Sequence, residues 1–489
     1  MTEGPGQVVD MNGRRYRLVR QLGRGGQGAV FEVEGGRLAA KLVFDDSPSR
    51  RDRLRNQLIH VKRLTLGDLE IAQPLEMLRE PYLGYIMELL TGMVPLKVLA
   101  HMPRGEKSLV PWYIAGGGLR RRLRLLARAA DLLAQLHGKG LVYADPSPHN
   151  LFVSAGVTGN EVRLIDADNL SYQSSTGGPG IYTPGYGAPE LMAGWRGVDT
   201  LTDAHAFGVI AFQTLAQVHP LLGDAVAQGE PEQEEKALRG ELPWIDHPED
   251  ERNRSSVGLP RDFVLSNRLK ELCQLAFGKG LRDRTARPGL SLWAERLHAA
   301  ADATLSCPGC TSTYYVNSPD CPWCGVAKPR YVLASFFLSD PAVVSCESCK
   351  AGYTVEEAEC PRCRAPRPEG VTRLALVRGP DPKRTRLTQA VLTEHSPLLI
   401  SDRLLKGQMG RGSHTPRVEV RLEGGRLWLR SLDGVVYTLV SMSGSRNLPV
   451  GPQAMNVPID SGRGTWRLHL GSLEKLHRIV NFELRQEGT

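Results

Sequence analysis

Eight of the nine cysteines in this 489-residue chain fall in four C-x-x-C pairs, and no other feature constrains the fold as strongly. Ten residues separate the two pairs within each half of the pattern, and the second half repeats the first at an offset of 39 residues. Such a repeat indicates a duplicated module. Four thiolates suit tetrahedral Zn²⁺. The sequence therefore predicts two structural zinc ions, one held by Cys307, Cys310, Cys321 and Cys324, the other by Cys346, Cys349, Cys360 and Cys363.

The pairing of the cysteines has two solutions, two sequential ribbons or a RING-like cross-brace that joins the first and third pairs. A cross-brace normally has a short gap between the second and third pairs and a histidine ligand. Here the gap spans the 21 residues 325–345, and no histidine lies between 307 and 363. Tandem zinc ribbons over 303–366 are therefore expected. Closed sites with four cysteine ligands serve structure, which argues against a nucleic-acid partner.

Length and composition bound the remainder of the chain. At about 150 residues per domain, this length predicts roughly three domains. The 41% hydrophobic and 23% charged residues are typical of globular proteins. No apolar run approaches a membrane span, and the N-terminus resembles no signal peptide, so we expect a soluble cytoplasmic protein without a membrane partner. The net charge of +8 suits nucleotide, phosphopeptide or nucleic-acid partners and selects none.

Hydrophobic periodicity divides the rest of the chain. A polar lead-in, 1–15, precedes a segment over 16–302 whose pattern is first strand-like and then mostly helical, so a small β-lobe and a larger α-lobe are expected. A basic linker over 367–386 leads into a β-rich segment, 387–489. Together with the ribbons, these segments predict a multidomain α+β protein.

The β-rich segment contains a clear hairpin signal in RVEVRLEGGRLWLR. Val418, Val420 and Leu422 share one face, a Gly-Gly turn follows, and Leu427 and Leu429 return. This alternation predicts a β-hairpin within an all-β, sandwich-like domain.

A glycine-rich string, G-x-G-x-x-G-x-V, lies between two strand patterns near the N-terminus. Glycines let the backbone approach phosphate oxygens closely, and those of this string are Gly23, Gly25 and Gly28. The same string also occurs in dinucleotide-binding folds, but there a helix follows, whereas FEVEGG after Val30 indicates a strand. In the next apolar strand pattern, Lys41 requires an anionic partner to offset its desolvation.

Two later segments supply carboxylates and an amide. LVYADPSPHNLFV holds Asp145 and Asn150, and VRLIDADNL holds Asp166. They provide a candidate base and two oxygen ligands for Mg²⁺, which prefers oxygen. In this order the motifs resemble those of protein kinases over about 16–300, in particular a divergent bacterial serine/threonine branch.

The resemblance implies a bilobal protein-kinase fold and transfer of the γ-phosphoryl group of Mg-ATP to a protein serine or threonine. It implies catalytic roles for Asp145 and Lys41, and Mg²⁺ ligation by Asn150 and Asp166. The implied ATP-binding residues are Gly23, Gly25, Gly28, Val30, Lys41, Met87, Glu88 and Leu89. It also implies that TPGYGAPE ends the activation segment, that Asp203 is the aspartate of the following helix, and that Arg287 pairs with Glu190.

The sequence departs from the kinase pattern at four places. Tyr143-Ala144, Ser147 and Ala167-Asp168 replace His-Arg, Lys and Phe-Gly, and the helix after Lys41 lacks a glutamate, leaving Asn56 or Gln57 as hydrogen-bonding substitutes. Because the lysine, the base and both metal ligands remain, we favour an active enzyme. One alternative is a pseudokinase scaffold that binds nucleotide. The other is a nucleic-acid-associated regulator that acts through its ribbons.

The last segment faintly resembles a forkhead-associated domain, which implies a phosphoprotein partner. Arg403 and Ser413 are its candidate phosphate donors, and Asp433 stands where an amide is expected. A carboxylate there opposes phosphate, so we expect the phosphothreonine site to be weakened or lost. An unspecified β interaction domain is the alternative.

Overall fold

The computed structural model describes residues 6–25, 28–44, 47–64, 66–67, 69–167, 170–172, 182–195, 197–339, 343–354, 357–366, 386–406, 414–441, 447–459, 466–471 and 477–485. The chain divides into two compact units, Met1–Leu297 and His298–Thr489, called unit 1 and unit 2 below. Among the described residues, no helix is long and apolar enough to cross a membrane.

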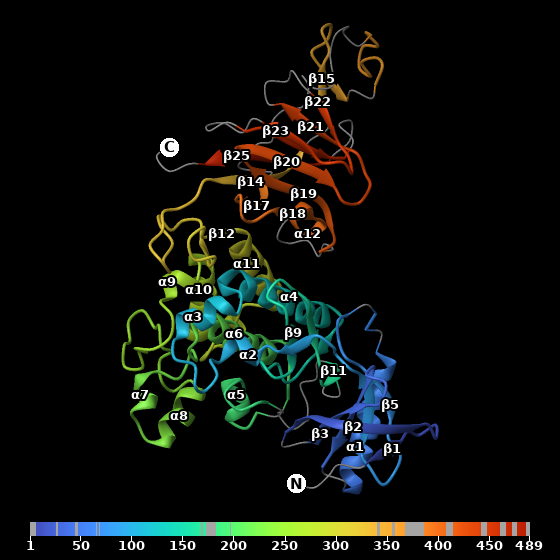
Figure 1. The fold of residues 1–489 in the computed structure, drawn as a ribbon, viewed down its shortest axis with the longest axis vertical. Helices are drawn as coiled ribbons and strands as arrows, with labels where there is room; N and C mark the ends of the chain where they lie inside the picture. Colours follow the sequence, from blue (N-terminus) through green and yellow to red (C-terminus); the bar gives the residue numbers. More distant parts are fainter. Residues whose placement is uncertain are drawn as a thin grey trace. The chain divides into compact units, whose positions relative to one another are not determined.

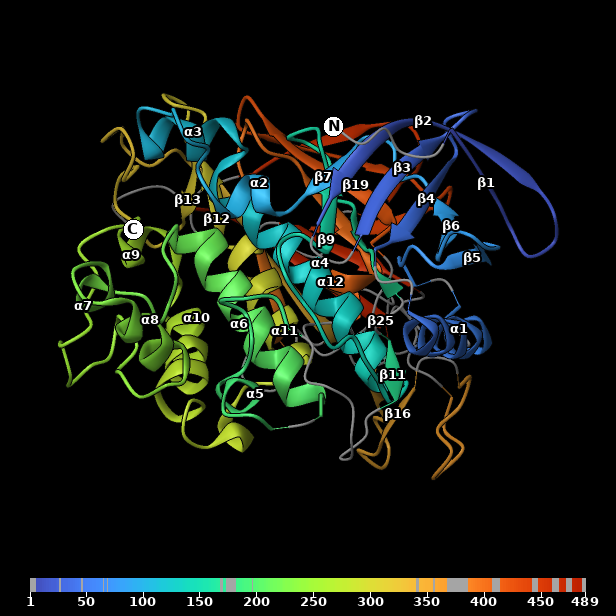
Figure 2. The same ribbon diagram turned by 90° about the horizontal axis from the view of Figure 1, so that it is seen from below.

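Unit 1 begins with an antiparallel six-stranded sheet in the order β1-β2-β3-β4-β6-β5, of which β1, β2, β3 and β5 are labelled in Figure 1. Alternate side chains of β3 are buried, namely Ala29, Phe31 and Val33, which builds an apolar core on one face. The helix α1 contacts β5 (Figure 2). The bounds are β1 (Gln7–Val9), β2 (Arg15–Arg24), β3 (Gly28–Val33), β4 (Leu38–Val43), α1 (Pro48–Arg63), β5 (Pro74–Met77) and β6 (Gly84–Glu88).

The rest of unit 1 is mainly helical. The long helices α4 and α6 pack against each other, and an Asp199–Thr202 capping box begins α6. The helices are α2 (Lys97–Ala100), α3 (Leu109–Ala115), α4 (Gly118–Gly138), α5 (Pro189–Met192), α6 (Thr200–Ala216), α7 (Asp224–Ala227), α8 (Pro231–Leu238), α9 (Arg261–Val264), α10 (Asn267–Cys273) and α11 (Leu290–Asp302), which crosses the division between the units; a π-helical turn covers Gln274–Lys279 and a 3-10 turn covers Arg284–Ala286. The strands are β7 (Met93–Pro95), β8 (Leu141–Val142), β9 (Leu151–Ser154), β10 (Val162–Leu164) and β11 (Ser171–Tyr172).

Unit 2 contains a sandwich of two antiparallel sheets and two short hairpins. The sheets have the orders β17-β14-β25-β24-β21-β22 and β18-β19-β20-β23, and the hairpins are β12-β13 and β15-β16. The bounds are β12 (Thr304–Ser306), β13 (Thr313–Tyr315), β14 (Tyr331–Ser339), β15 (Val343–Ser345), β16 (Gly352–Thr354), β17 (Arg386–Leu392), β18 (Leu398–Ser401), α12 (Asp402–Lys406), β19 (Pro416–Glu423), β20 (Arg426–Ser431), β21 (Tyr437–Ser441), β22 (Asn447–Val450), β23 (Met455–Pro458), β24 (Trp466–Leu470) and β25 (His477–Arg485).

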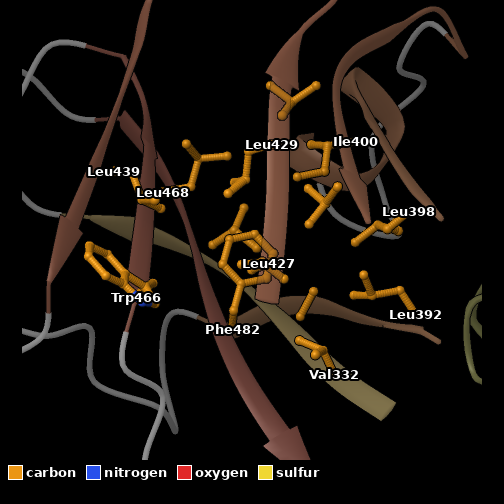
Figure 3. Close-up of a cluster of buried hydrophobic side chains, with 14 of the residues drawn as sticks. Val332, Leu392, Leu398, Ile400, Leu427, Leu429, Leu439, Trp466, Leu468 and Phe482 are labelled. Carbon is orange, nitrogen blue, oxygen red and sulfur yellow. The ribbon is translucent and has the colours of Figure 1, made fainter. Parts of the chain in front are cut away.

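Apolar side chains from both sheets meet between them. Figure 3 shows Leu427 and Leu429 of one sheet beside Leu468 and Phe482 of the other, and all four are buried. The predicted hairpin lies in this core: Val420 pairs with Leu429 across β19 and β20. Its turn residues Gly424 and Gly425 have φ values of +57° and +71°, the left-handed conformations that a two-residue hairpin turn requires.

One strand of the sandwich comes from the segment predicted to hold only ribbons. β14 pairs with β25 over nine positions and also with β17, so 331–339 belongs to the six-stranded sheet. The ribbons are predicted over 303–366, and β14 lies within that range. The second cysteine group follows β14 along the chain and so lies between two paired sandwich strands, β14 and β17. Its side chains Val332, Ala334 and Phe336 are buried in the core of the sandwich.

Candidate functional site

The loop that carries Asp145 is fixed by a buried carboxylate on α6. Asp203 is fully buried, and its two oxygens accept the backbone N–H groups of Tyr143 and Ala144 at 2.8 and 3.0 Å. His137 Nε2 lies 3.0 Å from the same carboxylate. Ala144 has φ +77°, which is uncommon outside glycine, and these bonds hold the backbone in that conformation. Asp203 therefore sets the direction in which Asp145 leaves the loop.

The Asp145 carboxylate is hydrogen-bonded to the segment at 183–190. Its Oδ1 accepts the backbone N–H and the hydroxyl of Thr183 at 2.7 and 2.8 Å. Asn150 Nδ2 donates to the Asp145 carbonyl at 3.1 Å. Burial raises the pKa of the Asp145 carboxyl, and the Thr183 hydrogen bonds oppose that shift without cancelling it. Sequence reasoning placed Thr183 only at the end of the activation segment and missed its contact with the base.

Lys41 and Asp166 meet in an ion pair. Lys41 Nζ lies 2.9 Å from Asp166 Oδ1, with 8% of the lysine side chain and 26% of the aspartate side chain exposed. Ile165 donates its N–H to the Asn150 carbonyl at 3.0 Å, which joins the Asp166 segment to the loop of Asp145. Four predicted residues from three separate segments thus come together.

The helix α1 does not provide a glutamate for this pair. Gln57 Nε2 instead donates to the Leu170 carbonyl at 2.7 Å, so α1 is tied to the segment that follows Asp166. Asn56, the other predicted substitute, is exposed. The lysine pairs with the carboxylate of Asp166.

The glycine string joins β2 to β3. Gly25 donates its N–H to the Gly28 carbonyl at 2.9 Å, and residues 26–27 lie outside the described residues. A Cβ at Gly28 would lie 2.2 Å from the Leu42 carbonyl oxygen, so only glycine fits there. Gly23 pairs with Val30, and Val30 pairs in turn with Lys41. The strand register therefore places the glycine loop next to the lysine.

The predicted adenine-facing residues lie at the end of β6. Met87 is buried opposite Ala39, and Leu89 donates its N–H to the Arg37 carbonyl at 3.0 Å. Glu88 accepts Arg163 Nη1 at 3.2 Å. The Glu88 side chain is thus used in an ion pair.

The segment at 183–190 is anchored by a second, bidentate ion pair. Arg287 donates through Nη1 and Nη2 to the two oxygens of Glu190, both at 2.7 Å, as the sequence predicts. Tyr186 donates its hydroxyl to Gln213 on α6 at 2.7 Å. These contacts hold the segment in the position that brings Thr183 to Asp145.

The eight cysteines form two groups in sequential order. Within each group, four ligand atoms lie within 4.8 Å of one another. The sulfur–sulfur distances are 3.5 and 3.7 Å in the first group and 3.4 and 3.6 Å in the second. A tetrahedral zinc with Zn–S bonds of about 2.3 Å requires sulfurs about 3.8 Å apart. Both groups are compatible with zinc, and they are not cross-braced.

All four cysteine turns share one backbone pattern. In each, the first cysteine accepts the N–H of the residue four positions later, and that residue has a left-handed φ between +58° and +73°. The residues are Thr311, Gly325, Lys350 and Arg364. Trp323 donates Nε1 to the Thr313 carbonyl at 3.1 Å, a contact within the first ribbon.

The proposed phosphothreonine donors of unit 2 are engaged elsewhere or lie outside the described residues. Arg403 forms a bidentate pair with Asp302 at 2.8 and 2.9 Å. Asp433 accepts the hydroxyl of Tyr437 at 2.6 Å and that of Ser431 at 3.0 Å, so it shapes the β20–β21 turn. Ser413 lies outside the described residues.

The chain is similar in sequence to known bacterial proteins. No protein-family model matches the chain. It is 31% identical over 248 residues to the serine/threonine-protein kinase Pkn1 of Myxococcus xanthus, covering 46% of this chain and 32% of that protein. The chain is a homologue of bacterial serine/threonine protein kinases. The DNA damage-responsive serine/threonine-protein kinase RqkA of Deinococcus radiodurans is 30% identical over 224 residues, 43% of this chain and 31% of RqkA.

A third relative is the serine/threonine-protein kinase pkn2 of Myxococcus xanthus, 28% identical over 231 residues, which are 43% of this chain and 25% of pkn2. The matches thus span about a third or less of these three curated relatives. Together with the strands, helices and sheets described above, the kinase homology agrees with a multidomain α+β protein.

Proposed function

We propose that this chain is an ATP-dependent serine/threonine protein kinase. It transfers the γ-phosphoryl group of Mg-ATP to a hydroxyl of a protein substrate. The observation that carries the proposal is the meeting of two pairs, Lys41 with Asp166 and Asp145 with Asn150. The 3.0 Å backbone hydrogen bond from Ile165 to Asn150 joins the segment of the first pair to the loop of the second. The homology to bacterial kinases supports it.

Each residue of this group has a distinct task. Asp145 accepts the proton of the substrate hydroxyl, and a buried carboxyl with a raised pKa is suited to proton transfer. Thr183 orients that carboxylate. Lys41 binds the phosphates of ATP, and its pairing with Asp166 offsets the cost of burying the ammonium and orients it.

The donor set also fits magnesium. Asn150 and Asp166 offer an amide and a carboxylate oxygen, the ligands that Mg²⁺ prefers. When bound, the ion would neutralise phosphate charge during transfer. Met87, Glu88 and Leu89, with the glycine string, would border the nucleotide.

In unit 2 we propose two structural zinc ions and a recognition role for the sandwich. The domain order is then kinase domain, first ribbon, sandwich strand β14, second ribbon and the remainder of the sandwich. The partners would be a protein substrate and, through the sandwich, a regulatory protein.

The test uses the full chain with Mg-ATP and a general protein acceptor such as casein. Mass spectrometry should find phosphoserine or phosphothreonine with the wild type and almost none with Asp145→Asn. The matched control is Asp262→Asn, the same chemical change at a residue whose side chain is 84% exposed. It should transfer phosphate at the wild-type rate.

Two results would contradict the proposal. Equal transfer by wild type and Asp145→Asn would remove the assigned base. Binding of ATP without transfer to any acceptor, including the chain itself, would support the pseudokinase scaffold, which the missing α1 glutamate favours.

A further inference from the structure

A short helix is fixed against the loop of Asp145. The N–H of Lys97, the first residue of α2, donates to the Pro148 carbonyl at 2.9 Å. The N–H of the preceding Leu96 donates to the Leu151 carbonyl at 2.7 Å. The side chains of Lys97 and His149, on the two sides of this junction, are exposed. Two basic residues therefore border the catalytic loop on its solvent side.

The other end of α2 reaches the segment that holds Thr183. His101, which follows the helix, places Nε2 3.2 Å from the Tyr186 hydroxyl. That hydroxyl donates to Gln213, so His101 Nε2 is the donor in their contact. His219 Nε2 lies 2.8 Å from the Gly185 carbonyl and supports the same segment. Thus α2 spans from the catalytic loop to the segment on which an acceptor would lie.

The basic groups of this region act on one another and on the base. Burial lowers the pKa of His101, and the charges of Lys97 and His149 lower it further. Burial and Lys97 also lower the pKa of His149, which Asp145 opposes. Among the described residues, no carboxylate forms an ion pair with these three side chains. By contrast, Arg163 and Arg287 of unit 1 each have a glutamate partner.

We propose that Lys97, His101 and His149, called the acceptor surface, select protein substrates with acidic residues beside the phosphorylated hydroxyl. This inference rests on the proposed kinase function. Lys97 supplies a full positive charge, and the exposed His149 imidazole supplies an N–H donor to a substrate carboxylate. His101, whose Nε2–H is donated to Tyr186, ties this surface to the segment that holds Thr183. A carboxylate on the acceptor provides the counter-charge that the described residues of this surface lack.

The first test compares three peptides that share one threonine acceptor, flanked by glutamate, glutamine or lysine. At low salt we expect the highest kcat/KM for the glutamate peptide, about tenfold above that for the lysine peptide. The reason is that two charges a few ångströms apart at a protein surface interact strongly enough to change an equilibrium constant by about that factor. The preference should shrink as salt screens the charges. Equal values for the three peptides would overturn the acceptor surface and leave the kinase function standing. No transfer to any peptide or to casein would overturn both.

The second test reverses the charge. Lys97→Glu should invert the preference toward the lysine peptide through the peptide KM, with the KM for ATP and the thermal unfolding temperature unchanged. Lys236→Glu makes the same change at an exposed residue of α8 and should keep the wild-type preference. His149→Gln should weaken the preference without inverting it. An unchanged preference in Lys97→Glu would show that this surface does not contact the acceptor.

Discussion

Units 1 and 2 each place a cation against a carboxylate where the sequence predicts phosphate binding, yet the two pairs differ. In unit 1, Lys41 Nζ lies 2.9 Å from Asp166 Oδ1, and the aspartate side chain is 26% exposed. Arg403 of unit 2 donates twice to Asp302, whose side chain is 8% exposed. A lysine ammonium beside a partly exposed carboxylate can exchange that partner for a ligand. A buried bidentate fork is committed to holding the structure together.

The difference shows that an ion pair does not by itself mark a binding site. What distinguishes unit 1 is the neighbourhood, because the segment of Asp166 is hydrogen-bonded to the loop of Asp145 and Asn150, the proposed base and amide ligand. In unit 2 Asp433 accepts hydrogen bonds from its own turn. Burial would raise the pKa of Asp433, but the bonds from Tyr437 and the turn outweigh this and lower it, so the residue stays charged.

The strongest test of this comparison removes the charges of unit 1. Lys41→Ala, Asp145→Ala and Asp166→Ala should each reduce kcat/KM by about 10²–10³-fold, because each removes a group that acts on the transferred phosphoryl or the attacking hydroxyl. Steady-state phosphorylation of casein measures the loss. Unchanged thermal unfolding would show that the fold survives.

The matched control is Asp168→Ala, two positions from Asp166 and outside the described residues. It should keep most of the activity. Equal losses at the two aspartates would contradict the assignment of the metal ligand to Asp166.

The cysteine groups give the next largest effect. We expect two zinc ions per chain, and Cys307→Ser or Cys346→Ser should each leave one. The consequences for stability should differ. Leu305 and Tyr314 of the first ribbon pack with Val391 of the sandwich. Among the residues that the structure describes, the cluster of the second ribbon contains only residues of that ribbon. Cys307→Ser should therefore also destabilise the sandwich, because losing a structural metal unfolds its ribbon.

Elemental analysis and thermal unfolding of the two variants measure these effects side by side. One zinc in the wild type, or loss of both ions in either variant, would rule out independent sites. Equal destabilisation by both variants would contradict the inference that the first ribbon stabilises the sandwich.

Local patterns in the sequence predicted the hairpin and the cysteine groups. The Gly424–Gly425 turn and the alternation of Val418 and Val420 depend on neighbours in the sequence, and so does the spacing of each C-x-x-C pair. The strand β14 depends instead on pairing with β25, about 140 residues later, and local alternation cannot name a partner.

The same distinction holds for the site. The order of motifs pointed to Lys41, Asp145, Asn150 and Asp166, because each stands in a recognisable local string. The contact of Thr183 with Asp145 and the bond from Gln57 to Leu170 join distant segments. Only the folded structure shows that the Thr183 hydroxyl bonds to Asp145 and that the Gln57 amide bonds to Leu170.

A smaller effect is expected from breaking the Arg403–Asp302 ion pair of unit 2. Arg403→Ala leaves Asp302 buried without its partner, which should cost roughly 3 kcal/mol of unfolding free energy, the low end for a buried pair because Arg403 is 18% exposed. Thermal or chemical unfolding of the full chain measures it. The control is Arg330→Ala, which removes an exposed arginine 4.0 Å from Glu394 and should change stability little.

Calorimetry with phosphothreonine peptides completes this test. Since Arg403 is engaged by Asp302, phosphorylated and unphosphorylated peptides should bind the full chain equally. Phosphate-dependent binding that Arg403→Ala abolishes would show that Arg403 can leave Asp302 to bind phosphate. The proposed difference between the two ion pairs would then be wrong.

The smallest effect is expected from removing phosphate groups from the chain itself. Ala144 stands where an arginine would clamp a phosphorylated activation loop, and a methyl group cannot pair with phosphate. Thr183 already donates its hydroxyl to Asp145, so a phosphate there would face a carboxylate of the same sign. Treatment with a phosphatase should therefore leave the initial rate nearly unchanged, although Ser171, Ser174, Ser175 and Thr176 offer further hydroxyls. A large loss of activity that preincubation with Mg-ATP reverses would mean that another cationic side chain binds the phosphorylated residue. Unit 1 would then contain a second anion-binding site.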